Sequence, residues 1–183
     1  LYENSIIVLY GDHYGISNSR NPSLAPLLGK NSETWSSYDN AMLQRVPYMV
    51  VIPGMTKGKV VNTYGGQVDL LPTLEHLLGI DSKQYLQVGQ DLLSPKHQQT
   101  VAFRSSNYFV TPKYTSYSGR TYYTETGQEI TNPDETTKAE LEKIKNKLTW
   151  EEAFGYEQAI ESANTVEKVK EITKELKEKS SKF

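Results

Sequence analysis

Cysteine is absent from this 183-residue chain. Its absence excludes disulfide bonds, thiolate metal sites and cysteine nucleophiles together. An excess of charge of one sign is also missing, because 20 Lys and Arg residues stand against 22 Asp and Glu residues, a net charge of -2. A chain without a basic stripe does not hold a polyanion by bulk charge, so we expect no nucleic-acid partner.

Long apolar runs are missing as well. The longest ones, residues 6–10 and 48–52, are far shorter than the roughly 20 residues that cross a bilayer. With 37% hydrophobic residues the chain can build one ordinary core or part of a larger one. It opens on Leu1, directly before the first apolar run and without a signal peptide, which suggests that a longer protein supplies residues upstream.

Residues 6–10 and the turn after them organise the chain. This apolar, β-branched run is typical of a strand buried on both faces of a sheet, and it stops at Gly11. Asp12 and His13 follow at the carboxyl end of the strand, where ligands bind in open α/β sheets. We expect Gly11 and Gly15, on either side of the pair, to permit the tight or left-handed backbone that turns both side chains toward one point.

The Asp12–His13 pair has the chemistry of half a metal site. A hard carboxylate oxygen with a borderline imidazole nitrogen suits manganese, iron(II) or zinc better than calcium. A catalytic divalent ion also needs further protein ligands and an open position, so those ligands and a nucleophile must come from elsewhere. The alternative is that Asp12 caps a turn and His13 is a loop histidine.

A polar excursion and a second strand follow. Residues 16–37 are rich in Ser, Asn, Gly and Pro, which predicts a surface loop with one helical turn. Trp35 and Tyr38 either cover the core or line a site in this region. Residues 48–52 predict a second fully buried strand, lying beside the first.

A leucine-rich helix is expected next. Asp69 is its predicted N-cap, Pro72 is tolerated in its first turn, and Gly79 with Ile80 predicts a left-handed C-terminal cap. His76 lies in this helix and is expected to be structural rather than a ligand. The buried face is predicted to consist of Leu70, Leu71, Leu74, Leu77 and Leu78.

From residue 100 the pattern changes to short alternating segments, which predict a small antiparallel sheet with a turn at Ser118 and Gly119. Its tyrosines fit cross-strand packing at a half-exposed surface, with a carbohydrate-stacking platform as the alternative. Arg104 ends the first strand and either reaches an anionic group or forms a surface salt bridge. The expected strands are residues 100–104, 108–111, 114–117 and 120–124.

Three helices are predicted in the last fifty residues. Pro133 is expected at the first position of a helix that runs to about Leu148. A capping box at residues 149–152 opens a second helix that reaches Ala163. Thr165 opens the last helix, whose apolar stripe packs on the rest of the chain or binds a partner.

Three blocks of sequence, residues 6–15, 45–54 and 66–80, follow one another in an order that closely resembles the C-terminal part of the sulfatase and alkaline-phosphatase superfamily. Within that superfamily the forms YGDHYG, GQVD and VAFR are similar to the lipoteichoic acid synthases, the phosphoglycerol transferases of Gram-positive envelopes. The form VAFR is residues 101–104.

The resemblance implies the C-terminal portion of an alkaline-phosphatase/sulfatase-like α/β fold. We expect residues 1–99 to form its mostly parallel sheet and helices, residues 100–131 a small antiparallel β subdomain, and residues 132–183 a helical tail. An incomplete sheet would expose an edge and an apolar face, so the isolated chain is expected to oligomerise.

The resemblance also implies a metal-dependent transferase. Asp12 and His13 would be two ligands of a catalytic manganese ion, with magnesium or zinc as alternatives. The family's threonine nucleophile, glutamate ligand and substrate-contacting histidine precede this segment, so Thr63 and Thr73 receive no such role and the chain alone is expected to be inactive. Arg104 is a candidate for substrate binding.

The implied partners are those of a parent enzyme: phosphatidylglycerol, a growing glycerophosphate polymer and the missing N-terminal part of the same protein. We expect that enzyme at the extracellular face of the cell membrane, anchored by upstream transmembrane helices, or released into the medium. One alternative is a sulfatase or phosphonate/phosphodiester hydrolase, which Tyr14 disfavours because sulfatases usually have glycine there. The other is a non-catalytic binding module that uses the tyrosine-rich sheet and the charged last helix.

Overall fold

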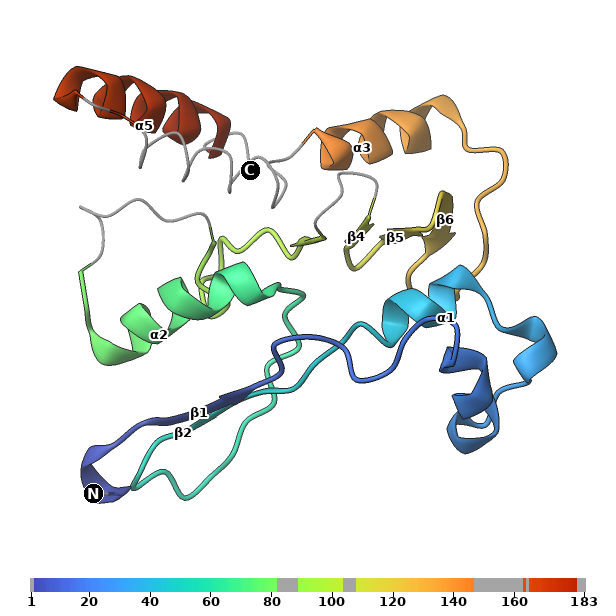
Figure 1. Cartoon of the computed structure of the whole chain (residues 1–183), viewed down its shortest axis with the longest axis horizontal. Coiled ribbons are helices and arrows are strands. Elements are labelled where there is room, and N and C mark those ends of the chain that lie inside the picture. Colours follow the sequence, from blue (N-terminus) through green and yellow to red (C-terminus); the bar gives the residue numbers. More distant parts are fainter. Residues whose placement is uncertain (1, 82–88, 104–107, 147–162, 164, 181–183) are drawn as a thin grey trace. The chain divides into compact units, whose positions relative to one another are not determined.

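A computed structural model describes residues 2–81, 89–103, 108–146, 163 and 165–180 (Figure 1). The chain divides into two compact units, Leu1–Asn62 and Thr63–Phe183. The first unit contains a two-stranded sheet with short helices, and the second contains a four-stranded sheet with longer helices.

The sheet of the first unit consists of β1 (Ile7–Tyr10) and β2 (Tyr48–Val51), which run side by side in Figure 1. Their pairing is antiparallel, with Ile7 opposite Val51. The expectation of a mostly parallel sheet is therefore wrong for the strand pairs that the structure describes. The connection between β1 and β2 contains only short helical pieces, whereas a parallel pair needs a long crossover, usually through a full helix.

These two strands are also less buried than predicted. Ile7 and Val51 share one face with Leu9 and Met49, because these pairs lie directly opposite each other in the register. The four side chains are between 38% and 52% exposed. The prediction of two fully buried strands is wrong here, because the two strands and short helices of this unit leave that face uncovered.

The excursion between the strands is more helical than predicted. It contains two 3-10 helices, η2 (Asn21–Leu28) and η3 (Ser32–Thr34), and then the short helix α1 (Ser37–Met42). A further 3-10 turn, η1 (Tyr2–Asn4), precedes β1. Helix α1 begins where the Asp39 carboxylate accepts hydrogen bonds from the backbone N–H and the hydroxyl of Ser36, which satisfies an otherwise unpaired donor of the first turn.

In the second unit the leucine-rich helix α2 (Leu70–Leu78) ends as predicted. Gly79 has a φ of 68°, and the N–H of Ile80 donates to the Glu75 carbonyl at 2.9 Å. This is the left-handed cap that satisfies the last carbonyls of a helix. The buried face is narrower than predicted, because Leu71 and Leu78 are 57% and 54% exposed.

The start of α2 differs from the prediction. A 3-10 turn, η4 (Gln67–Asp69), precedes the helix, so Asp69 has helical dihedral angles and its side chain does not cap α2. Its carboxylate instead accepts a hydrogen bond from the N–H of Gly66 at 2.8 Å. Asp69 stands at the N-cap position of α2 as predicted, but its side chain makes no capping hydrogen bond there, because the extra turn gives it helical dihedral angles.

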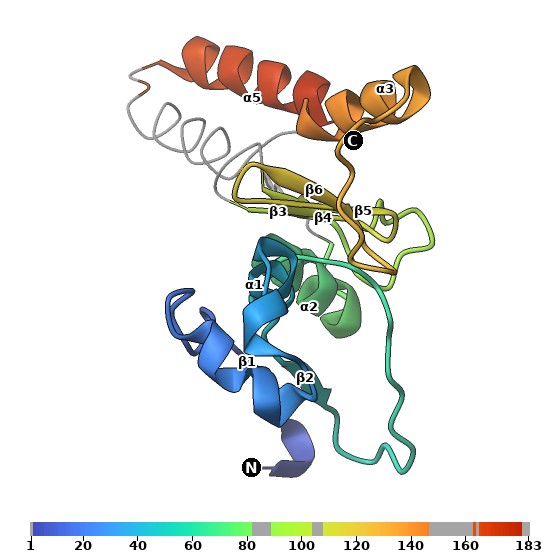
Figure 2. The same cartoon turned by 90° about the vertical axis from the view of Figure 1, so that its right-hand side faces the viewer.

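The predicted antiparallel sheet is confirmed (Figure 2). Ser118 and Gly119 form the turn between its last two strands, with φ angles of 52° and 78°. Two left-handed residues in a row match the twist of a tight hairpin. In sheet order the strands are β3 (Val101–Ala102), β4 (Phe109–Val110), β5 (Tyr114–Tyr117) and β6 (Arg120–Tyr123).

Most tyrosines of this sheet are more buried than predicted. Tyr114, Tyr117 and Tyr122 are at most 8% exposed. The rings of Tyr114 and Tyr123, directly opposite each other on β5 and β6, have centroids 6.0 Å apart. This cross-strand packing agrees with the structural interpretation of the tyrosines rather than with a stacking platform.

Helix α3 (Glu135–Lys145) covers one face of this sheet. Its Leu141 packs with Phe109 and Tyr114 in the hydrophobic core. The helix begins later than predicted, because Asp134 is the N-cap and accepts the N–H of Thr137 at 2.7 Å. Proline at the first helical position is therefore not observed.

The last helix, α5 (Val166–Ser180), begins as predicted, because the hydroxyl of Thr165 accepts the N–H of Lys168 at 3.2 Å. The helix predicted over residues 149–163 lies almost entirely outside the described residues. In the described parts of both units, no helix has the length and apolar character needed to cross a membrane.

Candidate metal site after strand β1

The Asp12–His13 turn directly continues the β1–β2 ladder. The N–H of Gly11 donates to the Pro47 carbonyl at 3.0 Å, so the backbone stays paired one residue beyond β1. A Cβ at Gly11 would lie 2.6 Å from the Cβ of Val46, closer than real carbon atoms approach. Glycine is required at position 11 because its backbone lies so close to the Val46 side chain on the neighbouring segment.

The predicted left-handed backbone is not observed on either side of the pair. Neither Gly11 nor Gly15 is among the glycines with positive φ. A Cβ at Gly15 would meet no atom within 4 Å. Gly11 therefore positions the turn through close approach, and Gly15 has no comparable role.

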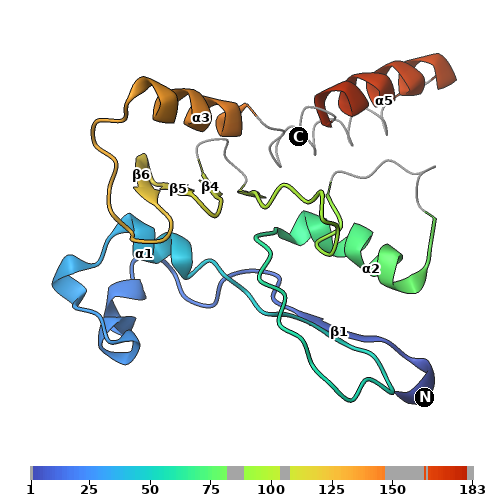
Figure 3. The same cartoon turned by 180° about the vertical axis from the view of Figure 1, so that it is seen from behind.

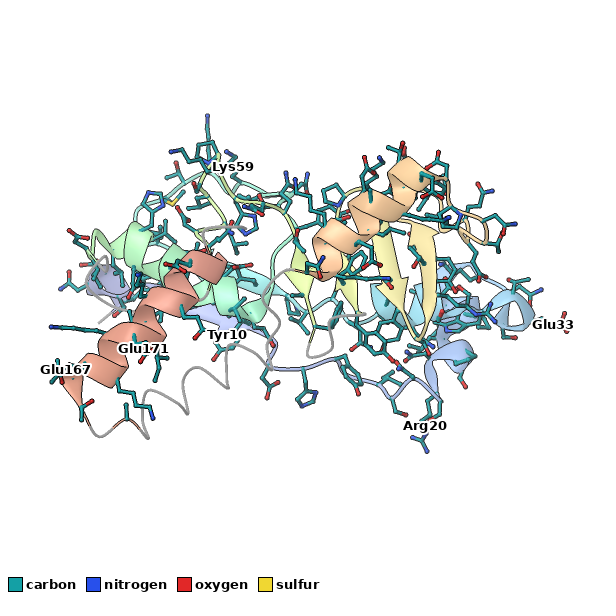
Figure 4. All side chains as sticks on the ribbon, turned by 90° about the horizontal axis from the view of Figure 1, so that it is seen from above. Tyr10, Arg20, Glu33, Lys59, Glu167 and Glu171 are labelled. Atoms are coloured by element: carbon teal, nitrogen blue, oxygen red, sulfur yellow. The ribbon has the colours of Figure 1, made fainter. Side chains whose placement is uncertain are left out.

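The two predicted ligands lie close together and face solvent. His13 Nε2 is 3.8 Å from Asp12 Oδ1, and the side chains of His13 and Asp12 are 73% and 83% exposed. In Figure 4 this turn lies on the chain between the labelled Tyr10 and Arg20. Both side chains are accessible to an ion or a substrate.

One hydrogen bond fixes which histidine nitrogen is available. His13 Nδ1 lies 2.7 Å from the carbonyl oxygen of Tyr14. Because a carbonyl only accepts, Nδ1 carries the hydrogen, and the neutral ring leaves Nε2 with a lone pair near the Asp12 carboxylate. A histidine ligand held by a backbone carbonyl through its other nitrogen is the usual arrangement at metal centres.

The pair can supply two ligands and no more. Ligand atoms at about 2.1 Å from a divalent ion lie about 3 to 3.5 Å from each other, so a small rotation of either side chain would suffice from the observed 3.8 Å. Across the described residues, no group of three or more His, Asp or Glu side chains could hold an ion. The remaining ligands are not found in this part of the chain.

A polar network holds the loop that follows the pair. Asn21 is completely buried, and its amide donates to Oδ1 of Asn18 at 3.3 Å and to Oδ1 of Asn40 at 3.0 Å. The indole N–H of Trp35 also donates to Asn40, at 2.9 Å. The polar end of Trp35 is therefore part of an internal network, which favours a covering role over a site-lining one.

A second group in the loop is ionic. Lys30 forms a hydrogen-bonded ion pair with Asp39 and lies 6.0 Å from the ring centroids of Trp35 and Tyr38. Burial favours a higher pKa for Asp39, but the Lys30 ammonium and the N–H and hydroxyl of Ser36 outweigh it and lower the pKa. Asp39 therefore stays ionised and anchors helix α1.

The other candidate residues have structural roles or lie outside the described part. His76 Nδ1 is 2.7 Å from Asp91 Oδ2, in agreement with its structural interpretation. The hydroxyl of Thr73 donates to the Asp69 carbonyl at 2.6 Å and accepts the N–H of Leu92 at 2.9 Å. Arg104 lies outside the described residues.

One buried histidine was missed by sequence reasoning. His97 is 4% exposed at its side chain and lies 3.5 Å from the carboxylate of Asp69, which is 6% exposed. The histidine occurs in a polar stretch without periodicity, so no sequence pattern marks it as buried.

Comparison with known proteins defines the class. Residues 1–80 match the Sulfatase family. The crystal structure of the lipoteichoic acid synthase LtaP from Listeria monocytogenes matches 77% of this chain and 36% of that one, with a TM-score of 0.55 and 23% identity. Residues 1–80 are therefore similar to the sulfatase family, and the chain has the corresponding sulfatase-like α/β fold.

More similar sequences define the branch. "Lipoteichoic acid synthase 2" of Bacillus subtilis is 48% identical over 148 residues, which are 81% of this chain and 22% of that protein. "Lipoteichoic acid synthase" of Staphylococcus aureus is 41% identical over 148 residues, with the same coverage. The chain is thus similar to the lipoteichoic acid synthases and spans about a fifth of the length of these relatives.

Proposed function

We propose that this chain contributes two metal ligands, Asp12 and His13, to a phosphoglycerol transferase. The enzyme would move glycerophosphate from phosphatidylglycerol to the end of a growing lipoteichoic acid chain. The observation that carries the proposal is the position of His13 Nε2, 3.8 Å from the Asp12 carboxylate at the end of β1. The names and identities of the relatives support the choice of reaction.

The donor chemistry of the pair supports a cation. The Asp12 carboxylate and the His13 Nε2 both present lone pairs to the same exposed region, so one cation could contact both. Carboxylate oxygen with imidazole nitrogen suits manganese, with magnesium or zinc as alternatives. A divalent ion bound there would lower the pKa of a coordinated hydroxyl and offset negative charge on the phosphoryl oxygens.

The nucleophile is expected outside this chain. The hydroxyl of Thr73 is buried and engaged on both sides, so it cannot attack a substrate. By resemblance to that family, we expect a threonine nucleophile and a glutamate ligand before the segment that contains Asp12. We therefore expect the isolated chain to be inactive and the complete enzyme to work at the extracellular face of the membrane, held by helices of its own upstream part.

A segment exchange tests this function. The aligned 148 residues of the Bacillus subtilis relative are replaced by those of this chain, and lipoteichoic acid is measured in cells that depend on the hybrid enzyme. We expect polymer synthesis by the hybrid and a loss of about a hundredfold or more with Asp12→Asn or His13→Gln, because removing even the hydrogen-bonding partner of a metal ligand typically costs about 10- to 100-fold.

The matched control is His76→Gln in the same hybrid. His76 is 59% exposed at its side chain and pairs with Asp91, so its replacement should leave synthesis within about twofold. Full activity of the His13→Gln hybrid would contradict the proposal. Hydrolysis of phosphatidylglycerol without polymer growth would favour a phosphodiester hydrolase of the same superfamily.

A further inference from the structure

Residues 89–100 are fastened to the start of α2 by one buried carboxylate, and we call this segment the strap. Asp69 Oδ1 accepts the N–H of Gln90 at 2.8 Å, near the beginning of the strap. Asp69 Oδ2 accepts the N–H of Gly66 at 2.8 Å and lies 3.5 Å from His97 Nε2, near the end of the strap. A single side chain thus contacts both ends of the segment.

The tautomer of His97 makes its contact with Asp69 attractive. The N–H of Gln99 donates to His97 Nδ1 at 2.9 Å, so Nδ1 is an acceptor. In the neutral ring the hydrogen is then on Nε2, the nitrogen that faces the Asp69 carboxylate. Both side chains are more than nine-tenths buried, where an unsatisfied donor or acceptor is costly.

The middle of the strap is held by contacts that depend on the same arrangement. The N–H of Leu92 donates to the Thr73 hydroxyl at 2.9 Å, and that hydroxyl donates to the Asp69 carbonyl. The N–H of Gln98 donates to the Gln90 side-chain carbonyl at 3.0 Å, which closes the strap on itself. Figure 3 shows this segment, in yellow-green, beside α2.

Two glycines show how closely the strap lies on the turn before α2. A Cβ at Gly89 would overlap the backbone carbonyl of Val68, and a Cβ at Gly65 would overlap the Leu92 side chain. The strap therefore packs directly on this turn, through backbone contact at one end and side-chain contact near the middle.

We propose that the strap opens and closes as one unit and that Asp69 is its latch. Loss of the carboxylate leaves the Gly66 N–H, the Gln90 N–H and His97 Nε2 without their acceptor at the same time. The His97 side chain is buried and the two N–H groups are partly buried while the strap is closed, so the strap opens rather than retain them unsatisfied. Opening also frees β3, which follows residue 100 and is held to β4 by two residue pairs.

Native-state hydrogen exchange on the full chain, read by NMR, tests the proposal. The reporters are the amides of Gln90, Leu92, Gln98 and Gln99. Three of these amides donate to acceptors other than Asp69. If each contact opened independently, a substitution at Asp69 would not change the exchange rate of all four amides. The reference amide is that of Thr111, which donates to the Tyr114 carbonyl in the four-stranded sheet.

In Asp69→Ala we expect all four strap amides to exchange faster by one common factor of at least about tenfold, with Thr111 unchanged. His97→Gln should accelerate the same set, including Gln90 at the other end. Asp134→Ala, which removes an aspartate cap of α3 outside the strap, should leave the four amides unchanged. Acceleration of Gln90 alone would overturn the proposal, and so would equal acceleration of Thr111.

If Asp69→Ala does not fold, the wild-type chain still decides the question. In low concentrations of urea, the four amides of a single opening unit share one opening free energy and one dependence on urea. Different values at Gln90 and Gln99 would show that the strap does not open as a unit.

Discussion

Replacement of Gly11 by alanine tests how the Asp12–His13 turn is positioned. The new Cβ would lie 2.6 Å from the Cβ and 2.9 Å from the Cγ1 of Val46. The segments that contain Gly11 and Val46 must therefore move apart by about 1 Å to restore a normal carbon contact. Overpacking of this kind costs about 1 to 3 kcal/mol. The movement also strains the hydrogen bond from the Gly11 N–H to the Pro47 carbonyl, which continues the β1–β2 ladder.

The matched control is Gly15→Ala, three residues after the turn begins. A Cβ at Gly15 meets no atom within 4 Å, and its φ is not positive, so alanine should change stability by less than about 0.5 kcal/mol or raise it slightly. Urea unfolding is followed by Trp35 fluorescence, in a background in which Trp150 is replaced by Phe. Equal stability of the two alanine variants would refute the close-approach explanation, because it predicts a loss at Gly11 only.

Three further predictions concern packing, a turn and pH. Leu141→Ala removes the α3 side chain that packs on Phe109 and should cost about 2 to 5 kcal/mol in thermal or urea unfolding, and a loss below about 1 kcal/mol would argue against this core. Gly119→Ala places a side chain at a φ of 78° and should cost about 1 to 2 kcal/mol, whereas unchanged stability would contradict the left-handed turn. Because the pKa of Asp39 is lowered in the folded state, its carboxylate stabilises the fold at pH values above the ordinary pKa of 3.8, and this contribution is lost as the pH falls through the lowered pKa. Asp39→Asn should therefore flatten the acid limb of a curve of stability against pH. An unchanged acid limb would contradict the Lys30 contact.

Local patterns were predictive where neighbouring residues decide the structure. The hairpin turn at Ser118 and Gly119, the cap at Gly79 and the helix start at Thr165 each depend on a few residues in sequence. The antiparallel sheet after residue 100 follows from alternation and turn residues for the same reason. The family resemblance also predicted the sulfatase-like fold.

Contacts between distant residues could not be predicted. The apolar run of β1 indicates burial. It does not predict that β2 pairs with it in the antiparallel direction or that one face of the two-stranded sheet is exposed to solvent. Asp69 was assigned to a helix cap because its partners, Gln90 and His97, lie more than twenty residues away. Gly11 was correctly singled out, but its reason, the close approach of Val46, is a tertiary contact.

The most direct test of the central claim is a titration of the full chain with Mn²⁺, read by paramagnetic broadening of NMR signals. We predict weak binding, because two ligands leave most coordination positions to water, with broadening first at His13 and its neighbours and loss of that effect in Asp12→Asn and His13→Gln. The exposed His76–Asp91 pair serves as an internal comparison, because it also combines an imidazole with a carboxylate. Tight, stoichiometric binding that survives His13→Ala, or broadening that begins at His76, would contradict the assignment of Asp12 and His13 as the metal ligands.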